Sequence, residues 1–175
     1  MKVLLTVIAM VVSVHLLSAQ NKSVGVEGIY NFQTSSIGVG GRFEIPLRYF
    51  SIVPQVSYFP SFNKVTEFYA GASLHANILK AKKWTSYGIL HGAFNGWLNH
   101  SDSPMSNAQF ANWDAEVGLG IKSNSCIFPF LEGRYNFKWQ EASVHLGIAY
   151  SFGCTKNKGI GTTCPVSGER FQPRR

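Results

Sequence analysis

The sequence has few charged residues, few cysteines and almost no long apolar run. Asp, Glu, Lys and Arg make up 14% of its 175 residues, whereas a soluble domain usually contains about 25%. Beyond the N-terminal segment, no apolar run reaches the roughly 20 residues that a membrane-spanning helix needs. The three cysteines lack the paired spacing of a zinc site. The sequence therefore disfavours an ordinary soluble domain, a helical membrane protein and a structural zinc domain.

The N-terminal segment 1–19 is typical of a secretory signal peptide. Lys2 provides a positive charge, residues 3–17 are mostly apolar, and Ser18 and Ala19 offer a small-residue cleavage site. The apolar part is shorter than a spanning helix. We therefore expect an exported mature chain that begins at or near Gln20.

Apolar residues alternate with small or polar ones through most of the mature chain. This alternation predicts β-strands with one apolar face. The mean hydropathy of +0.01 is compatible with membrane strands, because a barrel strand hides every second side chain from lipid. In the segment 84–97 both rows are apolar, so either Tyr87 and Ile89 or Leu90 and Phe94 could face outward. Eight strands are predicted, at about 23–33, 37–45, 50–58, 67–78, 84–97, 110–122, 127–136 and 143–152.

The last predicted strand carries a specific pattern, His145-x-Gly147-x-x-Tyr150-x-Phe152. It resembles the closing-strand signal that the assembly machinery of outer-membrane β-barrels reads. Over about 23–152 the chain resembles the small OmpX and OmpA-like outer-membrane barrels, although in this sequence Phe152 is not the last residue. The resemblance implies an all-β fold: an eight-stranded antiparallel up-and-down transmembrane β-barrel in the outer membrane of a Gram-negative-type cell. An even number of strands returns both termini to the periplasm.

A soluble barrel such as a lipocalin, which binds a ligand inside, is the main structural alternative. In that fold the apolar rows would line the interior. Here the polar rows combine small residues with charges of both signs, which suits a narrow lumen. The apolar rows begin or end in aromatic residues, as the interfacial girdles of membrane barrels do. We therefore expect the apolar rows to face outer-membrane lipid, including lipopolysaccharide.

Charged residues of both signs occupy the polar rows of the predicted strands. Seven are expected to form a salt-bridge network across the lumen: Arg42, Glu44, Asp114, Glu116, Lys122, Glu132 and Arg134. Side chains fill the interior of an eight-stranded barrel, so a plugged lumen is favoured over a narrow, porin-like pore. Acid–base chemistry by paired carboxylates is a further alternative, but a structural ion network is the preferred interpretation.

Catalytic and metal sites have weak support in the sequence. His100 and Ser101 lie in the longest loop, and some eight-stranded barrels are enzymes that modify lipid A with His and Ser near the rim. A catalytic triad requires a geometry that neighbouring residues of one loop do not provide. Three histidines lie on different predicted strands and are expected to be hydrogen-bonded interior residues: His75, His91 and His145. We predict no catalytic residues, no metal and no cofactor.

The segment 153–175 is predicted to be a basic periplasmic tail. Cys154 and Cys164 are close in sequence and would form a disulfide in an oxidising periplasm, which leaves Cys126 as the odd cysteine. The tail either contacts the cell wall or a periplasmic partner protein, or is an unstructured extension. The net charge of +7 can indicate nucleic-acid binding, but an exported chain rarely meets nucleic acid.

These patterns predict three parts: a signal peptide (1–19), a transmembrane β-barrel (20–152) and a tail (153–175). The expected role is structural or interactive and non-enzymatic, in envelope integrity, adhesion or an envelope assembly. A lipid A-modifying enzyme, a narrow pore and a lipocalin-like binder are the alternatives.

Overall fold

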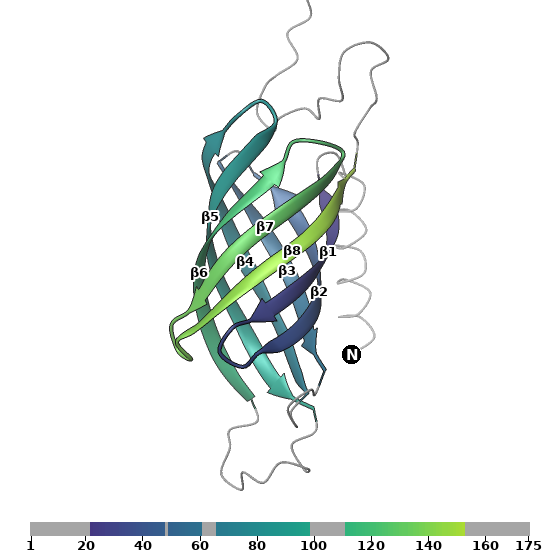
Figure 1. Cartoon of the computed structure of the whole chain (residues 1–175). Coiled ribbons are helices and arrows are strands. Elements are labelled where there is room, and N and C mark those ends of the chain that lie inside the picture. Colours follow the sequence, from purple (N-terminus) through teal and green to yellow (C-terminus); the bar gives the residue numbers. More distant parts are fainter. Residues whose placement is uncertain (1–21, 48, 61–65, 99–110, 153–175) are drawn as a thin grey trace, which may run out of the picture.

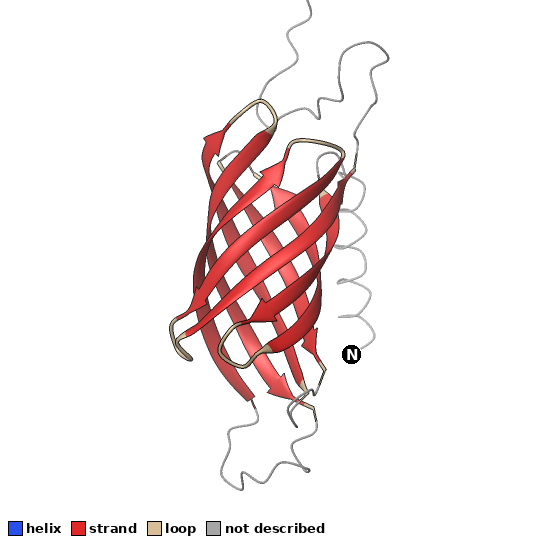
Figure 2. Ribbon diagram, viewed as in Figure 1, coloured by secondary structure: helices blue, strands red, loops and turns tan. Residues whose placement is uncertain are grey.

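A computed structural model describes residues 22–47, 49–60, 66–98 and 111–152. Within these ranges, eight antiparallel strands follow one another in chain order and close into a single barrel (Figures 1 and 2). The strands are β1 (Ser23–Asn31), β2 (Ser36–Pro46), β3 (Phe50–Phe59), β4 (Glu67–Lys80), β5 (Trp84–Trp97), β6 (Ala111–Ser123), β7 (Ile127–Asn136) and β8 (Glu141–Ser151). The predicted all-β, eight-stranded antiparallel barrel is therefore confirmed.

The barrel closes because β1 pairs with β8 as well as with β2. Nine residue pairs join β1 to β8, from Ser23 opposite Ser151 to Asn31 opposite Ser143. Every strand then has two hydrogen-bonded neighbours, which removes the exposed edges that would otherwise favour aggregation. None of the described residues forms a helix that is both long and apolar enough to cross a membrane.

The two ends of the barrel differ in what they carry. The terminal end, at the top of Figure 1, holds the first and last described residues, and the amide of Phe152 donates to the carbonyl of Lys22 at 2.7 Å. Strands β2, β4 and β6 also end there. Strands β1, β3, β5 and β7 end at the opposite end, which we call the loop end. The predicted signal peptide and tail, together with His100 and Ser101, lie outside the described residues.

Apolar side chains cover the outside of the barrel and polar side chains fill its inside, which is the reverse of a soluble barrel. Trp113 on the outer wall is 71% exposed, whereas Glu132 in the interior is fully buried. In β5, Leu90 and Phe94 face outward, and Tyr87 faces inward. This decides which row of β5 faces outward, a question that the sequence left open. Charged, amide and hydroxyl side chains fill most of the interior, with a small apolar cluster formed by Phe128, Phe130 and Ala149.

Exposed aromatic residues gather near both ends of the outer wall. Toward the loop end, neighbouring rings meet edge to face, as in Tyr30 with Phe32 at 5.2 Å and Phe94 with Trp113 at 5.5 Å between centroids. At the terminal end, Tyr150 and Phe152 meet in the same way. Two aromatic belts separated by an aliphatic band are typical of membrane-spanning barrels.

Candidate functional site

The polar interior is the candidate functional site, and its largest feature is a buried group of charges. We define the central charge cluster as Glu27 on β1, Arg42 on β2, Glu116 on β6, and Glu132 and Arg134 on β7. The guanidinium of Arg42 donates to both Glu27 and Glu132. Its Nη2 lies 2.9 Å from Glu132 Oε2. The cluster therefore connects strands that lie far apart in the sequence.

Arg134 completes the cluster from the same strand as Glu132. Its Nε and Nη2 donate to Glu132 Oε2 at 3.0 and 2.6 Å, and its Nη1 lies 3.6 Å from Glu116 Oε2. Glu132 thus forms ion pairs with two guanidinium groups at once. Charge-assisted hydrogen bonds of this kind are about twice as strong as neutral ones.

Neutral side chains hold the charged groups in place. The Tyr87 hydroxyl on β5 donates to Glu132 Oε1 at 2.7 Å, and Gln55 Oε1 on β3 accepts from Arg134 at 3.1 Å. The Arg42 guanidinium lies 4.0 Å from the centroid of the Phe130 ring. With these contacts, the polar network reaches side chains of β1, β2, β3, β5, β6 and β7.

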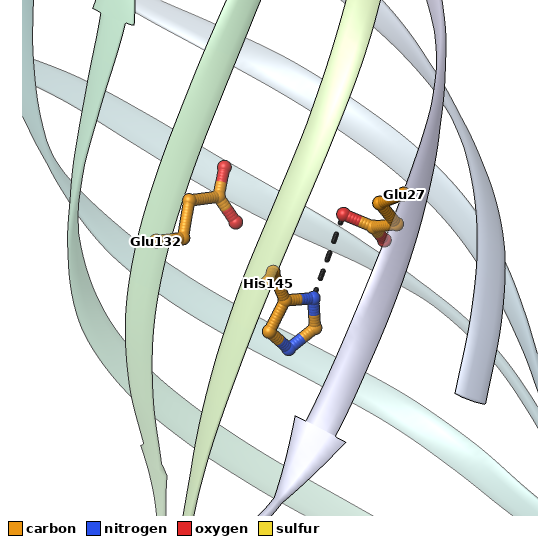
Figure 3. A group of neighbouring side chains, drawn as sticks. All are labelled: Glu27, Glu132 and His145. Atoms are coloured by element: carbon orange, nitrogen blue, oxygen red, sulfur yellow. Dashed lines mark ion pairs between the residues drawn. The ribbon is translucent and has the colours of Figure 1, made fainter. Parts of the chain in front are cut away.

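Two carboxylates of the cluster and a neighbouring histidine on β8 approach each other as metal ligands would: Glu27, Glu132 and His145 (Figure 3). Their ligand atoms all lie within 4.8 Å of one another, and His145 Nδ1 is 3.5 Å from Glu27 Oε2. However, Arg42 already binds both carboxylates, and Arg134 binds one of them. Two fixed guanidinium charges would repel a divalent cation, so we do not assign a metal site here.

A second, smaller ion pair lies nearer the terminal end. Lys122 on β6 bonds to Glu44 on β2, and the Ser23 hydroxyl donates to Glu44 at 3.4 Å. The Lys122 side chain is 18% exposed, so this pair is partly open to water. It stands apart from the central charge cluster.

The three interior histidines occupy different environments. His91 Nδ1 lies 2.9 Å from the Ser73 hydroxyl, and its Nε2 lies 3.4 Å from Gln55 Nε2. His75 instead stacks on Tyr87 with 4.7 Å between ring centroids. Neither ring nitrogen of His75 has a hydrogen-bond partner among the residues that the structure describes. Hydrogen bonding therefore holds for His91 and for His145, whose Nε2 lies 3.3 Å from the Ser143 hydroxyl, but His75 is held by ring stacking.

A separate hollow opens at the loop end of the barrel. We call it the loop-end cavity. It has a volume of about 260 Å³ and is lined by polar, acidic and aromatic side chains, including Asn31, Glu67, Asn95, Trp97, Trp139 and Glu141. Two tight turns border it, at 32–35 and 137–140. Each turn is fixed by an asparagine, since Asn31 Oδ1 and Asn136 Oδ1 each accept two backbone N–H groups of the turn that follows.

The structure places the seven charged residues that the sequence selected in the interior, but not in one network. Four of them belong to the central charge cluster, and Glu44 and Lys122 form their own pair. Asp114 Oδ2 accepts instead from the side-chain amide Nδ2 of Asn136 at 3.0 Å. Sequence reasoning did not include Glu27 or Tyr87 in the network, although Glu27 stood in a predicted polar row.

The closing strand divides its predicted signal residues between the two faces. His145 and Gly147 face inward, and Tyr150 faces outward with Phe152 beside it. A Cβ atom at Gly147 would overlap both the Phe130 ring and the carbonyl oxygen of Val26. Packing alone therefore requires glycine at this position. Recognition of these residues by the assembly machinery stays a prediction.

Of the three cysteines, the structure describes Cys126. Cys126, which the sequence left unassigned, is engaged in a disulfide, and no free cysteine occurs in the described ranges. Cys154 and Cys164 lie outside those ranges, so the predicted bond between them is not tested there. Because the chain has three cysteines, a disulfide that joins Cys126 to one of these two would exclude that bond. The carbonyl of Cys126 accepts from the amide of Ser151 at 2.8 Å, which places Cys126 beside the end of β8.

No family model matches the sequence, and no curated protein matches it. Solved structures do resemble the fold. The N-terminal β-barrel domain of Pseudomonas aeruginosa OprF is 16% identical with a TM-score of 0.56, and the match covers 75% of this chain and 97% of that domain. A de novo designed transmembrane β-barrel is 15% identical with a TM-score of 0.51, covering 74% of this chain and 93% of the design. A second designed barrel, solved by NMR, is 14% identical with the same TM-score, covering 76% and 94%. These likenesses establish the architecture of a transmembrane-type barrel.

Proposed function

We propose that the chain is a non-enzymatic outer-membrane protein with a structural or interaction role in the cell envelope. The barrel serves as a closed anchor that holds its loop end at the cell surface and its tail in the periplasm. The exposed aliphatic and aromatic wall supports this proposal, because such a surface is stable only when lipid covers it. Lipopolysaccharide and the barrel assembly machinery are then its first partners.

The observation that carries the proposal is the central charge cluster. Arg42 on β2 bonds across the interior to Glu132 on β7, and Tyr87 reaches the same carboxylate from β5. Side chains of this size and charge occupy the middle of a narrow barrel and leave no open path for ions. A closed lumen argues against a pore and in favour of an anchor.

Among the residues that the structure describes, the interior also lacks the arrangement that acyl transfer requires. Ser73 and His91 form a serine–histidine pair at 2.9 Å, but both are almost fully buried. The other ring nitrogen of His91 faces the Gln55 amide, whereas a catalytic histidine needs a partner that stabilises its positive charge, usually a carboxylate. This pair supports a structural role for Ser73 and His91.

Conductance measurements test the closed lumen. The mature protein inserted in planar bilayers is expected to give no steady unitary current. A double variant with Arg42→Ala and Glu132→Ala removes the side chains that cross the interior and serves as the matched positive control. Steady channels from the unaltered protein would overturn the closed-anchor proposal.

The interaction role of the tail needs its own experiment. We expect that deleting residues 153–175 leaves a folded barrel but abolishes the recovery of any periplasmic partner with the purified protein. The folded state of the truncated protein is checked by its resistance to unfolding in cold SDS. Unchanged recovery of the partner would show that the tail is not the contact.

A further inference from the structure

The loop-end cavity concentrates negative charge that no described cation balances. Glu67 Oε2 accepts from the Tyr69 hydroxyl at 2.7 Å and from Asn95 Nδ2 at 3.4 Å. Glu141 Oε2 accepts from Asn31 Nδ2 at 2.7 Å. Both carboxylates therefore have neutral partners, and neither takes part in an ion pair within the described ranges.

The nearest turn does contain a cation, Lys138, whose Nζ lies 5.3 Å from the centroid of the Trp139 ring, but its hydrogen bonds go to groups other than the two carboxylates. Lys138 Nζ donates to Asn112 Oδ1 and to the carbonyl of Trp113 at 3.0 Å. The chain as a whole is basic, with a net charge of +7. A protein with a net positive charge does not attract cations in general. Any attraction of a cation to this cavity would therefore come from the local carboxylates.

Asn95 provides a second, independent sign of a missing ligand. Its side chain lines the cavity and is 6% exposed. Because Nδ2 donates to Glu67, Oδ1 is left as a buried acceptor without a hydrogen-bond partner among the described residues. Leaving a buried acceptor unpaired is costly, so the cavity needs a donor. The two carboxylates that line the same cavity are acceptors as well.

The walls of the cavity decide which class of donor fits. Phe59, Tyr69, Trp97 and Trp139 line it together with the acids, and aromatic faces attract organic cations and pack against hydrocarbon. A metal ion would need three ligand atoms close together. Among the residues described, the only such group of His, Cys, Asp and Glu is Glu27, Glu132 and His145, which lies outside this cavity.

We propose that the loop-end cavity binds a small organic amine, whose ammonium group lies between Glu67 and Glu141 and donates to Asn95 Oδ1. An alkylammonium carries three N–H donors and one positive charge, which matches the acceptors present. Its hydrocarbon part contacts the aromatic walls. This inference is independent of whether the lumen conducts.

Calorimetric titration of the full-length mature protein in detergent micelles tests the proposal, with 1,4-diaminobutane as the probe. The neutral isostere 1,4-butanediol is the matched ligand control. Saturable binding of the diamine and at least tenfold weaker binding of the diol are expected. Equal binding of the two compounds, or no saturable binding of the diamine, would overturn the proposal. Tighter binding of calcium than of the diamine would overturn the assignment to an organic cation.

Substitutions then locate the binding site. Glu67→Gln and Glu141→Gln are each expected to weaken diamine binding at least tenfold, whereas Glu44→Gln at the terminal end leaves it unchanged. Trp139 lies in an exposed turn, so Trp139→Ala keeps the fold and is expected to weaken binding several-fold. If the diamine binds equally to all four variants, it binds elsewhere and the proposed site is wrong.

Discussion

Replacing Glu132 with glutamine removes the carboxylate that the two interior arginines share. In the folded barrel Glu132 is fully buried and accepts from Arg42, Arg134 and Tyr87. Glutamine has nearly the same shape, but it keeps one acceptor oxygen and turns an NH₂ group toward a guanidinium. The variant therefore loses hydrogen bonds and attraction without creating a cavity.

The structure sets the size of the expected effect. Removing one partner of a buried ion pair usually costs about 3–5 kcal/mol. Here Arg42 retains Glu27, and Arg134 retains Glu116 at 3.6 Å and Gln55. We therefore expect the lower end of that range, about 3 kcal/mol, which lowers the folding equilibrium constant by roughly two orders of magnitude.

Urea titration of the barrel in lipid vesicles, followed by tryptophan fluorescence, measures the free energy of unfolding. Glu44→Gln is the matched control, because Glu44 has Lys122 and Ser23 as partners and this pair is partly open to water. Its expected loss is smaller, about 1.5 kcal/mol. A loss below about 1 kcal/mol for Glu132→Gln, or equal losses for the two variants, would refute the view that the central charge cluster holds the barrel together.

Two further predictions concern packing and cysteine chemistry. Gly147→Ala is expected to reduce the folded fraction strongly, since its Cβ would overlap Phe130. Gly133→Ala is the control and is expected to be neutral, because a Cβ there meets no atom within 4 Å. Equal folded fractions of the two variants, measured by gel mobility, would contradict this packing account. Peptide mapping by mass spectrometry, with and without reductant, is expected to find Cys126 joined by a disulfide to a peptide of the tail 153–175. A Cys126 thiol that can be alkylated in the unreduced protein would contradict that bond.

The regular alternation of the sequence was enough to predict most of the barrel. β7 has the bounds that were predicted for it, 127–136, and polar residues alternate with apolar or small ones from Leu131 to Asn136. In β5 both rows are apolar, so alternation alone could not orient the strand. The orientation of β5 depends on Tyr87, whose hydroxyl bonds to Glu132, 45 residues further along the chain.

The contents of the interior were less predictable for a related reason. A polar row tells which residues face inward, but contacts across the lumen depend on strand register and side-chain reach. Glu27 lies opposite Gly40 in the β1–β2 register, while Arg42 lies opposite Gly25, so their bond is diagonal. The loop-end cavity combines Asn31 with Glu141, 110 residues apart. No local motif signals such a contact.

The central claim is that this chain forms a closed barrel with its apolar wall in the outer membrane. Its most direct test is the gel mobility of the mature protein from an envelope fraction, compared with and without boiling in SDS. The account predicts that the protein is found in the outer-membrane fraction and migrates differently before and after boiling, because the closed barrel resists unfolding in cold detergent. Recovery of the protein in the soluble periplasm, with no change of mobility on boiling, would contradict it.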